Sequence, residues 1–188
     1  MAVLPICIMG DPVLHAPAAP VDVITDEIRT LVADMLETMD AAPGVGLAAP
    51  QVGVALRIFT YTYPDDDGAP WRGVIINPEL WIRPIEPGEP DPDDEAEGCL
   101  SVPGERFPLR RSDAAVVSGT DLDGAPVRIE VSGWRARILQ HEFDHLDGVL
   151  YIDRIDDSDW KTVQKIARKR GWNRPGVSWM PGVDDVDA

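Results

Sequence analysis

Three parts of the chain carry helix signals, and in the first of them apolar residues recur with helical spacing. From Thr25 to Asp40 they return every three or four positions, which predicts an amphipathic helix with Thr25 at its N-cap. A second helix is expected from Gly133–Trp134 to Gly148, where glycine is a natural stop. A third is expected from about Asp156 to Gly171, because its acidic residues come first and its basic residues last.

Shorter runs rich in β-branched and aromatic residues predict strands between these helices. The predicted strands are 3–9, 56–63, 73–78, 114–120 and 127–131. The last two flank Asp121–Gly124 and should form a hairpin. A turn is expected at 64–68, a mobile surface loop at the proline-rich acidic stretch 84–95, and fraying at 184–188.

Composition narrows the class of protein. A chain of 188 residues, 44% hydrophobic and 27% charged, is typical of one globular domain. The first ten residues lack the basic flank of a signal peptide and no segment is apolar enough to span a membrane, so we expect a cytoplasmic protein with Cys7 and Cys99 as free thiols. A net charge of −16 disfavours DNA and anionic membranes as partners. All three lysines nevertheless lie in the C-terminal stretch 161–174, together with several arginines.

The stretch Gln140–Gly148 carries the strongest chemical signal. His141 and His145 lie four residues apart, which places both imidazoles on one helix face, and Glu142 follows the first histidine. Two imidazoles can hold a divalent ion, and the glutamate can take a proton from water, which suggests metal-assisted hydrolysis. A solvated surface helix is the simpler alternative. His15 has no partner at ligand spacing and is expected to be a structural or surface residue.

Two other stretches are ambiguous on their own. Gly44–Gln51 is a run of small residues that suits either a tight turn or the close approach of a peptide backbone. Glu97–Pro103 contains Cys99, which by composition can be buried filler or a ligating thiol.

Taken together, in this order and at this separation, the three stretches resemble the three signature motifs of peptide deformylases. These enzymes remove the formyl group from the N-terminal methionine of newly made bacterial proteins. The family patterns are Gly-aliphatic-Gly-Leu-Ala-Ala with a following glutamine, Glu-Gly-Cys-Leu-Ser, and Gln-His-Glu with a following Asp-His-Leu. The resemblance extends from Gly10 to about Arg154. It implies an α+β fold, with antiparallel β-sheets packed around a central metal-binding helix, an N-terminal amphipathic helix and a C-terminal helix.

The resemblance also implies a site. Cys99, His141 and His145 would hold one divalent ion, Fe(II) in the cell, with zinc, nickel or cobalt found in purified members. Glu142 would take the proton of the attacking water and return it to the leaving nitrogen. The Gln51 amide and the Leu100 backbone N–H would stabilise the oxyanion.

For the substrate, the resemblance implies an extended N-formyl-methionyl peptide lying beside Val45–Gly46 and Gly98. Its methionine would enter a pocket lined by Val45, Ile138 and part of His141. Glu97 and Arg106 would form a supporting ion pair. Trp134 and Arg137 are expected on or beside the pocket and are not typical of the family. Some members contact the ribosome through C-terminal elements, which gives the basic stretch from about residue 156 a possible purpose.

Three other functions compete with this interpretation. A zinc peptidase would share the His-Glu-x-x-His pattern but usually takes its third ligand from downstream, where this chain offers only aspartates. A copper electron-transfer protein can use two histidines and a cysteine but has no need of Glu142. A catalytically silent relative would have no need of Cys99, Glu142 and Gln51.

Overall fold

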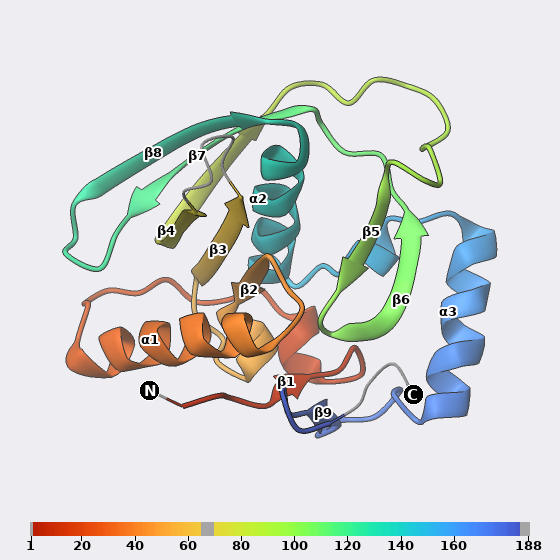
Figure 1. The fold of residues 1–188 in the computed structure, drawn as a ribbon, viewed down its shortest axis with the longest axis horizontal. Helices are drawn as coiled ribbons and strands as arrows, with labels where there is room; N and C mark the ends of the chain where they lie inside the picture. Colours follow the sequence, from red (N-terminus) through yellow and green to blue (C-terminus); the bar gives the residue numbers. More distant parts are fainter. Residues whose placement is uncertain (1, 65–69, 185–188) are drawn as a thin grey trace.

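The computed structural model describes residues 2–64 and 70–184. It contains the helices α1 (Asp26–Ala41), α2 (Gly133–Leu146) and α3 (Asp157–Arg170), and the 3-10 turns η1 (Pro12–His15), η2 (Ala49–Val52) and η3 (Tyr151–Asp153). Its strands form three antiparallel sheets (Figure 1). An α+β class with antiparallel sheets is therefore confirmed.

The largest sheet has the strand order β2-β3-β4-β7-β8. Its members are β2 (Gly46–Ala48), β3 (Ile58–Pro64), β4 (Pro70–Ile82), β7 (Ala114–Thr120) and β8 (Pro126–Ser132). The predicted hairpin is confirmed as β7 and β8. The strand predicted at 73–78 is only part of β4, because a register shift between Ile76 and Glu79 lets the strand continue past Pro78.

Helix α2 packs on this sheet through an apolar face. Leu139 and Leu146 are fully buried and belong to one hydrophobic cluster with Phe59 of β3 and Val117 of β7. On the other side of α2 lies the hairpin of β5 (Ala96–Cys99) and β6 (Val102–Pro108) (Figure 1). The polar face of α2 is therefore enclosed between a sheet and a hairpin, which is where the two histidines lie.

A second hydrophobic cluster joins α1 to both ends of the chain. Met35 and Met39 of α1 are buried in it, as expected of methionines that fill a core. Helix α3 adds Val163 and Ala167. Beyond α3 the chain returns as β9 (Ser178–Trp179), which pairs with β1 (Ile6–Cys7) near the N-terminus (Figure 1).

Most predicted elements are confirmed within two residues, with a few differences. Thr25 occupies the N-cap of α1 but its side chain makes no capping hydrogen bond. The apolar run 3–9 forms a strand only at Ile6–Cys7. The stretch 84–95 contains no strand or helix, and Glu95 at its end is fixed by Arg110, with 2.6 Å between Oε2 and Nη2. The turn predicted at 64–68 and the fraying at 184–188 fall almost entirely outside the described residues. In the described part, no helix has the length and apolarity needed to cross a membrane.

Candidate metal centre and active site

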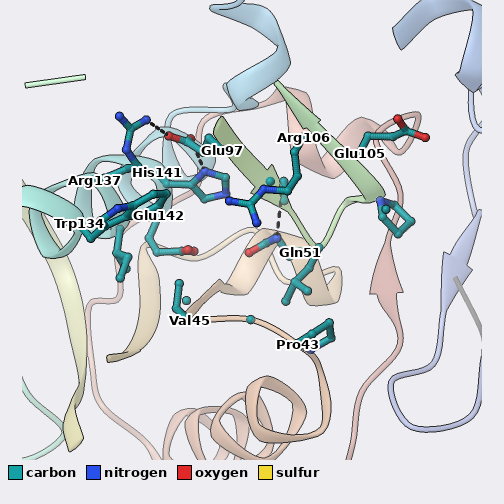
Figure 2. A pocket seen from close by; sticks show the side chains of 18 of the residues that line it. Pro43, Val45, Gln51, Glu97, Glu105, Arg106, Trp134, Arg137, His141 and Glu142 are labelled. Atoms are coloured by element: carbon teal, nitrogen blue, oxygen red, sulfur yellow. Dashed lines mark hydrogen bonds and ion pairs between the residues drawn. The ribbon is translucent and has the colours of Figure 1, made fainter. Parts of the chain in front are cut away.

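The three sequence motifs meet around one cavity of about 620 Å³ (Figure 2). The first motif supplies β2 and η2, the second the turn between β5 and β6, and the third α2. All the predicted site residues except His145 line the cavity, namely Val45, Gly46, Gln51, Glu97, Gly98, Cys99, Leu100, Arg106, Ile138, His141 and Glu142.

Cys99, His141 and His145 form a compact group of potential metal ligands. Their ligand atoms lie within 4.8 Å of one another. The Cys99 Sγ is 3.3 Å from His145 Nε2, and the two Nε2 atoms are 3.2 Å apart. Ligands of a tetrahedral ion with ordinary Zn–S and Zn–N bond lengths stand about 3.3–3.6 Å from one another. The three side chains therefore fit a single divalent ion.

Glu97 sets the orientation of His141. Its Oε1 is 2.6 Å from His141 Nδ1, so this ring nitrogen donates to the carboxylate and the lone pair is left on Nε2. A carboxylate behind a ligating histidine is a common device that fixes both tautomer and ring orientation. His15, in contrast, bonds through Nε2 to the Met9 carbonyl, which confirms it as a structural residue.

The predicted ion pair between Glu97 and Arg106 is wrong. Gly98 stands opposite Arg106 in the β5–β6 ladder and Glu97 stands opposite Phe107. Successive side chains of a strand point to opposite faces, so Glu97 and Arg106 lie on different sides of the hairpin. Arg106 instead donates to the Ala96 carbonyl at 2.8 Å.

The cationic side chains that pair with Glu97 are those of Arg111 and Arg137. Arg111 makes a two-pronged contact with the Glu97 carboxylate at 2.7 and 2.8 Å, and Arg137 Nη1 adds a third bond at 3.0 Å. Although burial opposes ionisation, the bonds and charge of Arg111, with His141 beside them, hold the pKa of Glu97 well below its usual range. Glu97 is therefore a fixed anion beneath the metal ligands.

The charge network continues to the surface through Asp144. Arg111 Nη1 also donates to Asp144 at 2.8 Å, and Arg154 closes on the same carboxylate at 2.7 and 2.8 Å. Neither Arg111 nor Asp144 was predicted as a site residue. Asp144 stood inside the third motif on the helix face next to His141, so helical spacing was the signal that could have indicated it.

Glu142 lies buried in the cavity wall directly against Gly46. A Cβ on Gly46 would stand 2.1 Å from Glu142 Oε1, so only glycine leaves room for this carboxylate. Burial raises the pKa of Glu142 to about 7, against an opposing effect of His141. Glu142 Oε2 is buried and has no hydrogen-bond partner among the residues described. Gly46 of the first motif thus leaves the space that the Glu142 carboxylate of the third motif occupies.

Gln51 is held in one orientation by its neighbours. Its Oε1 accepts the Ala48 backbone N–H at 2.8 Å, which directs Nε2 toward Cys99 Sγ at 3.6 Å and Ser101 Oγ at 3.3 Å. Gln51 is 1% exposed. Its amide N–H groups are therefore fixed at the edge of the ligand group.

Trp134 and Arg137 form part of the cavity wall, as expected. The Arg137 guanidinium lies 5.2 Å from the centre of the Trp134 ring, and Figure 2 shows the pair beside Glu97 and His141. Val45, from the first motif, also lines the cavity, and it is 41% exposed. Trp179 also lines the cavity, and the sequence patterns did not identify it as a site residue.

A buried Cys-His-His group with a carboxylate in the adjoining cavity is typical of a metal-dependent hydrolase. Comparison with known proteins agrees. The sequence model of the polypeptide deformylase family matches residues 3–161. The peptide deformylase of Rhodococcus opacus is 52% identical, with 97% of this chain and 95% of the relative covered, and that of Mycolicibacterium smegmatis is 50% identical, with 97% and 96% covered.

Solved structures give the same result. The peptide deformylase of Ehrlichia chaffeensis superposes with a TM-score of 0.78 at 34% identity, covering 90% of this chain and 97% of its own. That of Thermus thermophilus gives 0.76 at 36% identity, with 91% and 98% covered. The chain therefore belongs to the peptide deformylase family.

Proposed function

We propose that the protein hydrolyses the formyl amide of N-formyl-methionyl peptides, releasing formate and a free amino terminus. Cys99, His141 and His145 hold one divalent ion, and Glu142 transfers the proton. The observation that carries this proposal is the Glu142 carboxylate, buried in the wall of the cavity that Cys99 and His141 also line, with the His145 ligand atom within 4.8 Å of theirs. The chain acts as one catalytic domain, in the cytoplasm where nascent chains appear.

The ion supplies Lewis acidity and makes water nucleophilic near neutral pH. A thiolate and two imidazoles suit Fe(II), Zn(II), Co(II) and Ni(II). We expect Fe(II) in the cell, and zinc, nickel or cobalt in protein purified in air.

Glu142 moves one proton in each direction. Its carboxylate takes a proton from the attacking water and later gives it to the amine nitrogen as the C–N bond breaks. A general base works best when its pKa lies near the working pH, and burial brings the pKa of Glu142 to about 7. The same residue can therefore serve as base and acid within one turnover.

Gln51 and Leu100 are proposed to stabilise the oxyanion. Such donors are effective when they are fixed before the reaction begins. The bond from Ala48 N–H fixes the Gln51 amide, and Leu100 lies in the short turn between β5 and β6 on the cavity wall. The two donors thus approach from the first and second motifs.

The peptide is proposed to bind as an added strand. Within the described residues, β2 has a partner only on its β3 side, and β5 only on its β6 side. Both free edges border the cavity, through Val45–Gly46 and Gly98, so an extended backbone can pair with them. The methionine side chain would then rest against Val45 and Ile138, with Arg106 beside the following residues.

Replacing Glu142 by glutamine tests this proposal. The variant should keep one metal ion per chain, because the three ligands are unchanged, while kcat for formate release falls by about 10²–10⁴. Turnover close to that of the wild type would contradict the assigned role. Release of formate without cleavage of internal peptide bonds also separates this activity from that of a zinc peptidase, which the upstream ligand Cys99 already disfavours.

A contact with the ribosome is proposed through the basic end of α3. Lys165, Arg168 and Lys169 are exposed and form its last turns. An exposed cluster of this kind suits a phosphate backbone despite the acidic net charge. Replacing the three by glutamate should weaken cosedimentation with ribosomes at low salt, whereas Arg128→Glu on β8 should not. Unchanged cosedimentation of the triple variant would exclude this contact.

A further inference from the structure

The tail that follows α3 brings one tryptophan into the wall of the active-site cavity. Trp179 of β9 is 5% exposed and lines the cavity. Its indole Nε1–H donates to the Leu100 carbonyl oxygen at 2.8 Å. The family sequence model matches residues 3–161, so the tail that makes this contact lies beyond the residues that the model covers.

The bond from Trp179 falls on a peptide group that also touches a metal ligand. The Leu100 carbonyl and the Ser101 N–H belong to one planar peptide unit. The Ser101 N–H donates to Cys99 Sγ at 3.4 Å. A donor on the carbonyl oxygen polarises a peptide and strengthens its N–H as a donor. The indole and the sulfur are thus linked through a single peptide.

The tail that carries Trp179 is firmly attached. Strand β9 pairs with β1, and the Ile8 N–H donates to the Val177 carbonyl at 2.9 Å. A Cβ on Gly10 would stand 2.0 Å from the Trp172 carbonyl oxygen, so the two ends of the chain run in direct backbone contact there. The indole is therefore presented from a paired and packed segment.

The turn that receives the indole is held by the N-terminal segment as well. Met9 N–H donates to the Ser101 carbonyl at 2.9 Å, next to the bond from Trp179 to Leu100. Both ends of the chain thus fix the turn that carries the Leu100 N–H. A small rotation of this turn would move an oxyanion donor and the N–H bond to sulfur together.

We propose that Trp179 is a positioning residue of this active site. Acting through the Leu100–Ser101 peptide, it sets the hydrogen bond that the Cys99 sulfur receives and fixes the direction of the Leu100 N–H. This inference rests on the proposed function, because the roles of Cys99 and Leu100 belong to it. Hydrogen bonds to a ligating sulfur alter both the affinity for an ion and its electronic properties.

The variant Trp179→Phe keeps an aromatic ring in the wall and removes the indole N–H. Trp172→Phe is the matched control, since Trp172 is also 5% exposed on the same tail but is not part of the cavity lining. The probe is Co(II), whose affinity is measured by chelator competition and whose thiolate environment is followed by the sulfur-to-cobalt absorption band. Folding of each variant is checked by circular dichroism.

In Trp179→Phe the affinity for Co(II) should fall about tenfold, as for the loss of other outer-shell partners, and the absorption band should shift. The kcat for formate release should fall while KM for the formyl-methionyl peptide stays unchanged. Trp172→Phe should match the wild type in all four quantities. Equal cobalt affinity and spectrum in the three proteins would overturn the proposal. A higher KM with an unchanged cobalt spectrum would also overturn it, because Trp179 would then only line the substrate cavity and would not act on the Cys99 sulfur.

A measurement on the unchanged protein covers the case in which Trp179→Phe does not fold. The chain has six tryptophans, whose indole N–H signals can be followed by ¹⁵N NMR and assigned by single Trp→Phe substitutions. Zinc binding should shift the Trp179 signal more than the Trp172 signal, and equal shifts would overturn the proposal. The cobalt and NMR readouts require no turnover. A wild type that binds the ion but releases no formate would therefore refute the proposed function without deciding the role of Trp179.

Discussion

Replacing Gly46 by alanine should disable the enzyme although every proposed ligand and the proton-transfer residue Glu142 are retained. A Cβ at this position would stand 2.1 Å from Oε1 of Glu142, 2.5 Å from Cδ and 2.8 Å from Cγ. Ordinary contact begins near 3.4 Å, so the carboxylate must retreat by more than 1 Å. Glu142 is 3% exposed, so the surrounding packing resists this movement.

The size of the effect follows from that displacement. Misplacing a catalytic group by about 1 Å costs about 10²-fold in rate. This corresponds to about 2.7 kcal/mol of transition-state stabilisation. Because the three atoms nearest to the added methyl group all belong to Glu142, and Cys99 and the two histidines are unchanged, the metal content should stay at one ion per chain.

The assay is formate release from a formyl-methionyl peptide, coupled to formate dehydrogenase. Gly44→Ala serves for comparison. The atoms nearest to its Cβ would be Cδ1 of the Leu100 side chain at 2.8 Å and Cγ at 3.3 Å, and this substitution should cost less because that side chain is flexible. If Gly46 acts by making room for Glu142, Gly46→Ala should have no further effect in a Glu142→Ala background. Activity of Gly46→Ala near that of the wild type, or the same loss in both backgrounds, would refute this reasoning.

Three further predictions concern stability. Arg111→Met should lower the free energy of unfolding by about 3–5 kcal/mol in urea titrations, because it leaves Glu97 and Asp144 buried without their shared cation, whereas Arg128→Met on the surface should cost less than about 1 kcal/mol. The folded state lowers the pKa of Glu97, so its contribution is present above its ordinary pKa of about 4.3 and is lost as the pH falls toward the folded value. The stability difference between the metal-free wild type and Glu97→Gln should therefore shrink as the pH falls below about 4.3. A difference that grows in this acid range would contradict the lowered pKa. Asn77→Ala should cost about 3 kcal/mol, since it removes two bonds to Val21 and leaves a non-glycine residue without a polar side chain at a φ of 51°, and a loss below about 1 kcal/mol would contradict this.

Local sequence patterns were sufficient for the helices and for the ligand spacing. Helical periodicity and end residues located α1, α2 and α3, because each carries its signal within a dozen residues. The same periodicity placed His141 and His145 on one face, and the structure brings Cys99 to them from a separate hairpin. That third ligand depended on resemblance to a family and not on spacing.

The contacts that could not be predicted from the sequence are those that depend on strand register and on the path of the C-terminal tail. Glu97 was paired with the wrong arginine because strand register, which alternates side chains between faces, is not visible before the hairpin forms. The bond between Trp179 and Leu100 spans 79 positions and needs β9 to return to β1. Such long-range contacts arise from tertiary folding, and no local pattern encodes them.

In the proposed reaction, this chain removes formyl groups with one ion held by Cys99, His141 and His145 and with Glu142 as the proton-transfer residue. The most direct measurement is formate release from a formyl-methionyl peptide by protein purified without oxygen, with the metal content determined on the same sample. We expect one divalent ion per chain and one new amino terminus for each formate released. Fully loaded protein that releases no formate, or that cleaves internal peptide bonds instead, would contradict it.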